Sequence, residues 1–205
     1  MASKEAATFQ EVRGKVKTLY APSADAWRNW LASNHVKEKN IWLIIYRKES
    51  KTKSVYYPEA VDEALCYGWV DSKPNKRDSE SFYQFFAKRN PKSNWSKINK
   101  EKVERLLKAN KMAAAGMEMI SIAKANGTWT ALDEVEELVI PPDLKKARKT
   151  IPVALTNFEA FPKSVKRGIL EWILTAKLPD TRLKRITETV TLAAKNERAN
   201  QYRKN

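Results

Sequence analysis

Cysteine and histidine are nearly missing from this chain of 205 residues, which has one of each, Cys66 and His35. One cysteine cannot form an internal disulfide bond or a Cys-x-x-Cys pair of metal ligands. Mostly carboxylates would be left to complete a metal site, so we expect neither a metal ion nor a cofactor. The lack of cysteine pairs also fits a reducing compartment.

Glycine and long apolar runs are scarce as well. Five glycines are too few for an all-β fold with many tight turns. The longest apolar run, IWLIIY at 41–46, is far shorter than the roughly 20 residues that span a bilayer. The segment MASKEAATFQEVRGK at 1–15 lacks the apolar stretch of a signal peptide. We therefore expect a cytoplasmic protein without a transmembrane segment.

Basic residues, by contrast, are abundant. Lys and Arg number 39 against 24 Asp and Glu, which gives a net charge of +15. The excess is clustered, because 76–111 and 163–204 each hold eleven basic and four acidic residues, whereas 130–143 is net acidic. Such clusters favour an anionic partner, which could be a small phosphorylated ligand, a nucleic acid or an acidic membrane surface. A solvated basic surface without a particular partner explains the charge equally well.

Hydrophobic periodicity predicts an α+β fold, with a small sheet and helices in the N-terminal half and a helical bundle in the C-terminal half. Extended segments are predicted at 16–20, 40–48, 54–57, 68–72 and 81–86. Helices are predicted at 22–34, 58–68, 100–112, 113–127, 162–177 and 180–196, with a short one starting at the Pro141–Pro142 pair. Thr8 and Glu11 have the spacing of a helix capping box.

The same patterns suggest a domain organisation. We expect a flexible N-terminus at 1–15, a mixed α/β region at 16–127 and a flexible tail at 196–205. The helical region at 128–195 should pack on the mixed region to form one compact unit.

The segment ALCYGWVDS at 64–72 supplies four candidate pocket-wall residues, Glu63, Cys66, Trp69 and Asp71. Cys66 needs a nearby base to act as a nucleophile, and a cysteine on an apolar helix face is more often a core residue. Glu63 and Asp71 flank the same turn and have the chemistry of an acid–base pair. Ion pairs with lysine and a favourable interaction with the helix dipole are the simpler explanation for these carboxylates.

The segment KRNPKSNWSKIN at 88–99 is the stronger candidate for ligand binding. It combines cationic groups, short hydrogen-bonding side chains and one indole ring, as contact with phosphate or a nucleotide requires. Its candidate residues are Arg89, Lys92, Ser93, Trp95, Ser96 and Asn99. The alternative is an ordinary helix entry, in which Ser96 caps the helix and Trp95 packs against it.

Arg182 and Arg185 are three residues apart near the start of a predicted helix. This spacing suits binding of an anion, and a structural ion pair with Glu63 or Asp71 is the alternative. The chain has no Walker loop and no G-x-G-x-x-G, G-x-S-x-G or H-E-x-x-H motif.

Six segments in series resemble the bacteriocin-protection family of bacteria, also labelled YdeI/OmpD-associated. They are WRNWLASNH, WLIIYRKES, YPEAVDEALCYGWVDS, RNPKSNWSKINKEKVERLLKANKM, AGMEMISIAKANGTW and AKLPDTRLKRI, and they cover about residues 20 to 190. The family pattern of a histidine after the first helix, A-L-C-aromatic-G-W and S-x-W-S-x-x-N is met at His35, Cys66 and 93–99. The resemblance implies survival against bacteriocins and cationic peptides, and an association with an outer-membrane porin. Because a chain of charge +15 repels cationic peptides, we expect any protection to be indirect.

We hypothesise that the turn after Cys66, the Trp95 loop and the Arg182 helix meet to form one pocket with cationic walls and an aromatic floor. On this hypothesis the protein is a basic binding module for an anionic ligand. Two alternatives are a small enzyme that uses Glu63 and Asp71 or Cys66, and a nucleic-acid-binding protein. A third is that all these residues are internal contacts of the fold.

Overall fold

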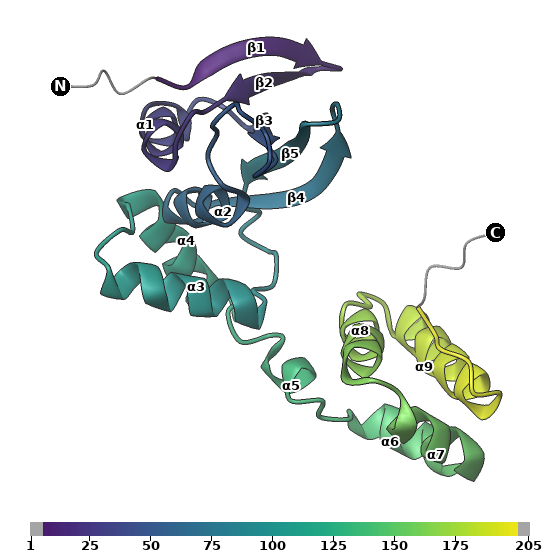
Figure 1. Ribbon diagram of the computed structural model, residues 1–205. Helices are drawn as coiled ribbons and strands as arrows, with labels where there is room; N and C mark the ends of the chain where they lie inside the picture. Colours follow the sequence, from purple (N-terminus) through teal and green to yellow (C-terminus); the bar gives the residue numbers. More distant parts are fainter. Residues whose placement is uncertain (1–5, 201–205) are drawn as a thin grey trace. The chain divides into compact units, whose positions relative to one another are not determined.

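The chain divides between Thr130 and Ala131 into two units, which are described one at a time. The computed structural model describes residues 6–200. All strands belong to the first unit, and the second unit is helical in its described residues (Figure 1). The predicted α+β fold, with its sheet in the N-terminal half, is confirmed. The predicted packing of the helical region on the sheet region stays a prediction.

A five-stranded sheet organises the first unit. Its strands are β1 (Thr8–Arg13), β2 (Val16–Tyr20), β3 (Asn40–Tyr46), β4 (Trp69–Lys76) and β5 (Ser81–Lys88). Their order is β1-β2-β3-β5-β4, and β2 and β3 are parallel while the other neighbours are antiparallel. The central strand β3 is buried on both faces because its sequence is apolar and aromatic along almost its whole length.

Helices cover one face of this sheet. Helices α1 (Ala24–Asn34) and α2 (Tyr57–Cys66) lie on the same side (Figure 1), and α3 (Lys97–Lys108) and α4 (Ala114–Ala125) contact α2. Ser23 caps α1 by accepting a hydrogen bond from the Ala26 amide at 3.2 Å. The main core lies here and is centred on Trp27, Leu43 and Phe86, each with 1% exposure or less.

The opposite face of the sheet carries a smaller aromatic cluster of Trp42, Ile44 and Tyr83. The Arg13 guanidinium lies 4.5 Å from the centre of the Tyr83 ring, and Arg77 lies 6.0 Å from the same ring. Two arginines therefore cover aromatic surface on this face through cation–π contacts.

Helix α4 approaches the end of α2 closely enough to require glycine. A Cβ added at Gly116 would overlap the carbonyl group of Cys66, which also accepts a hydrogen bond from the Ala113 amide at 3.1 Å. Gly68 ends α2 with a φ of +70°, a conformation that side-chain-bearing residues rarely adopt. A Cβ there would also meet Met119 Cγ at 2.8 Å.

The second unit has its own core. Its helices are α5 (Asp133–Glu136), α6 (Pro142–Lys149), α7 (Pro152–Ala160), α8 (Lys163–Leu174) and α9 (Pro179–Ala194). Proline occupies the first turn of α6, α7 and α9, where its missing N–H costs no hydrogen bond. Leu144, Phe158 and Ile169 are fully buried at its centre. None of the helices within 6–200 combines the length and apolar composition needed to cross a bilayer.

Three local predictions were wrong. The expected strand at 54–57 is a loop at 54–56, after which Tyr57 begins α2 with Pro58 in its first turn. Val55 in this loop donates a backbone hydrogen bond to the Ala21 carbonyl. Thr8 begins strand β1, not a helix, and so lies in paired structure although 1–15 was expected to be flexible. Ala199, in the expected flexible tail, is buried in the core of the second unit, while 201–205 lie outside the described residues.

Replacing Gly116 by alanine should lower the free energy of unfolding of the first unit by about 1–3 kcal/mol, because the backbone at Cys66 must move. Gly168→Ala in α8 is the matched control, since nothing lies within 4 Å of its added Cβ. That control should raise the stability of the second unit by up to about 1 kcal/mol. Urea unfolding followed by tryptophan fluorescence measures the first unit, which holds six of the seven tryptophans. Equal stability of G116A and the parent chain would show that the contact is not tight.

Candidate functional site

Arg89 is buried against an indole ring directly after β5. Its side chain is 6% exposed, its guanidinium carbon lies 3.7 Å from the centre of the Trp95 ring, and its Nη2 donates to the Asn94 carbonyl at 2.6 Å. Trp95 is itself 2% exposed, and its ring centre lies 5.0 Å from that of Trp129. Trp95 therefore belongs to the core and does not present an open stacking face.

The positive charge of Arg89 has no carboxylate partner within salt-bridge distance among the described residues. Its Nε is buried and makes no hydrogen bond. Three other partly buried arginines pair with acids at 2.6–2.9 Å, namely Arg28 with Glu63, Arg167 with Glu136 and Arg182 with Asp143. Burial lowers the pKa of the Arg89 guanidinium to about 10, so the group remains charged at pH 7.

A cavity of about 660 Å³ lies beside this arginine, and we call it the Arg89 cavity. Its polar and aromatic lining comes from four segments of the first unit, namely the end of α1, the turn after α2, the end of β5 and α4. The residues that supply this part of the lining are His35, Tyr67, Trp69, Lys88, Arg89 and Glu118. The remainder is Gly68 and apolar side chains, so the cavity joins cationic groups to an apolar surface.

Backbone hydrogen bonding connects the two sequence motifs at this cavity. The Arg89 amide donates to the carbonyl of Gly68 at 2.9 Å, which joins β5 to the turn of the A-L-C-Y-G-W motif. Trp69 Nε1 donates to the His35 carbonyl at 3.4 Å, and the His35 and Tyr67 ring centres are 5.2 Å apart. Trp69 and Arg89, which belong to separate sequence motifs, thus line the same cavity.

The other residues of the Trp95 loop have local roles. Ser96 caps α3 by accepting from the Asn99 amide at 3.3 Å, which is the helix-entry alternative described above. Ser93 donates to the Asn90 carbonyl at 2.7 Å, and the side chain of Lys92 is exposed. None of these three side chains lines the Arg89 cavity.

The acidic and thiol candidates lie apart from that cavity. Glu63 is 6% exposed and pairs with Arg28 at 2.6 Å and with Lys111 at 3.8 Å. Cys66 is fully buried, and this burial raises the pKa of its thiol although the Arg28 side chain opposes the shift. Its backbone carbonyl contacts α4 at Gly116.

Asp71 and His35 each contact a neighbouring group of the first unit. Asp71 accepts a hydrogen bond from the Tyr57 hydroxyl at 2.6 Å. Burial, and then this hydrogen bond, raise the pKa of Tyr57 to about 12. His35 Nδ1 lies 2.8 Å from the Leu31 carbonyl oxygen, within its own helix end.

Arg182 and Arg185 lie in the second unit and bind groups of that unit. Arg182 makes a two-pronged contact with Asp143, from Nε at 2.6 Å and from Nη2 at 3.0 Å, and this lowers the pKa of Asp143. Arg185 donates to the carbonyl of Trp172 at the end of α8 and lies 5.1 Å from the centre of the Trp172 ring. The alternative of ion pairs with Glu63 or Asp71, which belong to the first unit, stays a prediction, as does a meeting of these arginines with the Trp95 loop.

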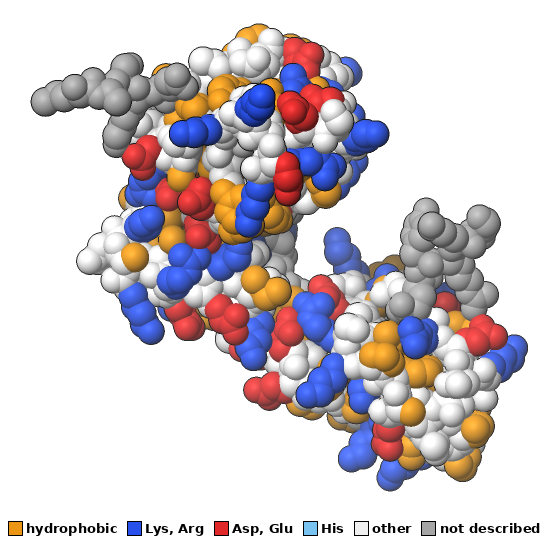
Figure 2. All heavy atoms as spheres, viewed as in Figure 1, with side chains coloured by type: hydrophobic (Ala, Val, Ile, Leu, Met, Phe, Trp, Pro, Cys, Tyr) orange, Lys and Arg blue, Asp and Glu red, His pale blue; other side chains and the backbone are white. Residues whose placement is uncertain are grey.

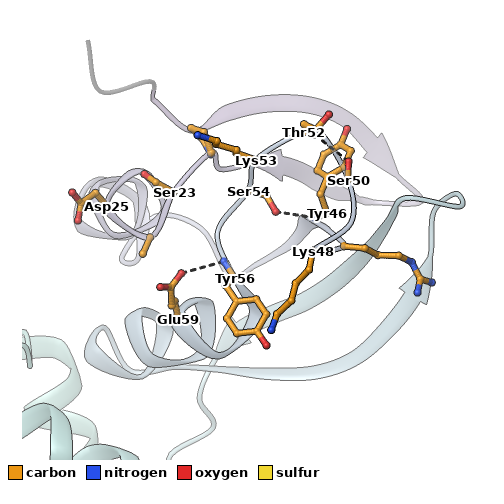
Figure 3. Close-up of a pocket in the computed structure, with 13 residues that line it drawn as sticks. Ser23, Asp25, Tyr46, Lys48, Ser50, Thr52, Lys53, Ser54, Tyr56 and Glu59 are labelled. Atoms are coloured by element: carbon orange, nitrogen blue, oxygen red, sulfur yellow. Dashed lines mark hydrogen bonds between the residues drawn. The ribbon is translucent and has the colours of Figure 1, made fainter. Parts of the chain in front are cut away.

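A second cavity, of about 590 Å³, was not predicted (Figure 3). It lies where the parallel strands β2 and β3 end, and sequence reasoning could have found it from the rule that ligands bind at the carboxyl ends of parallel strands. Several of its polar groups already have partners. Ser23 caps α1, Ser54 accepts from the Tyr46 amide at 2.9 Å, and Glu59 accepts from the Tyr56 amide at 3.2 Å. Its lysines are exposed, unlike Arg89.

No group of three or more His, Cys, Asp and Glu side chains within 6–200 is arranged to hold a metal ion. The lining of the Arg89 cavity combines the side chains of Lys88 and Arg89 with the rings of His35, Tyr67 and Trp69.

Comparison with known families gives two matches, one in each unit. Residues 19–119 match a model described as a domain of unknown function (DUF8412), and this segment contains the whole Arg89 cavity. Residues 137–196 match the model described as "Bacteriocin-protection, YdeI or OmpD-Associated". No curated protein and no solved structure gives a significant match to the chain. The resemblance drawn from the sequence is thus confirmed at residues 137–196, which match the model of the bacteriocin-protection, YdeI or OmpD-associated family.

Proposed function

We propose that the first unit is a binding module for a small anionic ligand and that the ligand binds in the Arg89 cavity. The observation that carries this proposal is Arg89 itself, a buried cation beside a cavity of about 660 Å³ and without a carboxylate partner among the described residues.

The physical argument rests on the cost of burying charge. A charged group taken out of water loses solvation, and proteins ordinarily offset this loss with an ion pair and a full set of hydrogen bonds. Among the described residues, the Arg89 side chain makes one hydrogen bond, to the Asn94 carbonyl, and contacts the indole face of Trp95. An anion in the cavity would supply the missing countercharge, and Lys88 would add a second cation.

The enzyme alternative has weaker support. Glu63 is paired with Arg28, and Asp71 is bound to Tyr57, so the two carboxylates belong to different local networks. Cys66 is fully buried with a raised thiol pKa, whereas a nucleophilic cysteine needs access and a lowered pKa. These contacts favour structural roles for all three residues.

The nucleic-acid alternative rests on net charge. Figure 2 shows Lys and Arg side chains spread over the visible faces of both units, with acidic side chains among them. A distribution of this kind favours weak, salt-sensitive attraction to polyanions over a defined nucleic-acid groove. Binding at Arg89, by contrast, would involve two cations and should depend only modestly on salt.

The family description suggests a biological context for the second unit. Because the chain has a net charge of +15, direct capture of a cationic bacteriocin is electrostatically unfavourable. We therefore propose that any role in bacteriocin protection is indirect and proceeds through an anionic ligand of the first unit.

Arg89→Gln should weaken binding of a small anion by about 10- to 100-fold, since it removes the charge and the charged hydrogen bonds. Isothermal titration calorimetry with phosphate, acetate and benzoate at constant ionic strength measures this effect. Arg148→Gln is the matched control, because Arg148 is 4% exposed, has no carboxylate within salt-bridge distance among the described residues, and lines none of the cavities described above. The proposal is wrong if no anion binds the parent chain, or if both variants lose affinity equally.

Cys66 in the folded protein should react with iodoacetamide on the order of 100-fold more slowly than in urea, because burial hides the thiol and raises its pKa. Mass spectrometry of timed samples gives both rates. An anion that binds only the folded chain should not raise the slow rate, since Cys66 does not line the Arg89 cavity and ligand binding disfavours opening. Equal rates in the two states would instead restore Cys66 as a candidate nucleophile.

A further inference from the structure

We infer that the Arg89 cavity selects an organic monocarboxylate with a compact apolar body, of which an aromatic acid is the simplest example. This inference rests on the proposed function and narrows the chemical class of its ligand. It follows from the charge of the cavity lining, from the cavity volume and from the apolar side chains beside Arg89.

The net charge of the residues that line the cavity favours a ligand with one negative charge. Lys88 and Arg89 supply two positive charges, and the carboxylate of Glu118 removes one. Lys88 Nζ donates to the carbonyl of Val36 at 2.6 Å, which holds this amine near the cavity edge. A single carboxylate balances the remaining charge, whereas a polyphosphate would bring an excess of negative charge next to Glu118.

The volume of the Arg89 cavity favours a ligand larger than an inorganic ion. A cavity of about 660 Å³ is in the range of sites that hold small organic molecules, typically about 300–1,000 Å³. Phosphate or acetate would neutralise Arg89 and leave most of that space to water. A larger body fills the cavity and adds contacts that the ion alone cannot make.

The lining beside the charges is apolar. Val36 is 71% exposed at one side of the cavity, and Pro91, Ala115 and Met119 line it as well. An exposed valine gains stability when a ligand covers it, because apolar area is removed from water. The thioether of Met119 also makes favourable contacts with aromatic rings.

The walls of the cavity are held in place by the fold. Helix α4 lies against the turn at Gly68, where an added Cβ would meet Met119 Cγ at 2.8 Å and the Ala115 carbonyl oxygen at 3.1 Å. The same turn accepts the backbone hydrogen bond from Arg89. The cation and the apolar wall are therefore fixed relative to one another, which reduces the entropic cost of binding.

The test compares four probes by isothermal titration calorimetry at constant pH and ionic strength: benzoate, acetate, inorganic phosphate and neutral benzamide. Benzoate should bind the parent chain about tenfold more tightly than acetate or phosphate, as partial burial of a phenyl ring provides. Benzamide should bind at least about tenfold more weakly than benzoate, because it lacks the charge that Arg89 recognises.

Two variants separate charge from apolar contact. Val36→Ser should reduce the affinity for benzoate several-fold and leave the affinity for acetate unchanged. Because Val36 is exposed, this substitution should leave the fold intact. Val139→Ser, at an exposed valine of the second unit, is the matched control and should change neither affinity. Arg89→Gln should weaken both acids, with circular dichroism and tryptophan fluorescence used to confirm its fold.

The outcomes separate the two proposals. If acetate or phosphate binds as tightly as benzoate and Arg89→Gln weakens both, anion binding stands and the preference for an apolar body is wrong. If none of the anions binds, both proposals are wrong. If Val36→Ser leaves benzoate affinity unchanged, the apolar wall does not contact the ligand and the inference is also overturned.

Discussion

The burial of Arg89 is the constraint around which the first unit is arranged. Its amide joins the end of β5 to the turn at Gly68, and its guanidinium lies on Trp95, whose amide in turn donates to the Thr128 carbonyl at 3.1 Å. Arg89, together with Trp95, therefore connects the end of β5 to the turn after α2 and to the segment that follows α4. The guanidinium cannot move into water without losing its contact with Trp95. The fold therefore keeps a cation beside the cavity, and its burial costs solvation free energy.

Periodicity was sufficient to predict the sheet and most helices, because β3 and α8 bury one side or both sides along their length. Periodicity did not predict β1, because all residues of this strand are exposed. Its pairing with β2 therefore produces no alternating apolar pattern in the sequence. Periodicity also failed at 54–57, where β-branched and aromatic residues resemble a strand but α2 begins at Tyr57, with Pro58 in its first turn.

Several residues of the candidate site could be predicted from the sequence, but their arrangement in space could not. Trp95 was expected either to stack on a ligand or to pack in the core, and the deciding contact is with Trp129, a residue 34 positions away that no local pattern indicates. Likewise, Trp69 and Arg89 share a cavity only because β4 and β5 pair from Trp69 opposite Lys88. Ser96, by contrast, caps α3 as its sequence context predicted, because capping is local.

A comparison of the partly buried Arg28 with the buried Arg148 and Arg89 shows why burial alone does not mark a binding site. Arg28 is compensated by Glu63 at 2.6 Å, so its charge is used within the fold. Arg148 is 4% exposed and lies 4.8 Å from the centre of the Phe158 ring, but it lines no described cavity. Among these three, Arg89 combines a position in a cavity lining with a charge that has no carboxylate partner among the described residues. On the proposed function, an anionic ligand would provide at Arg89 the countercharge that Glu63 provides at Arg28, and binding would offset the solvation that the buried guanidinium loses.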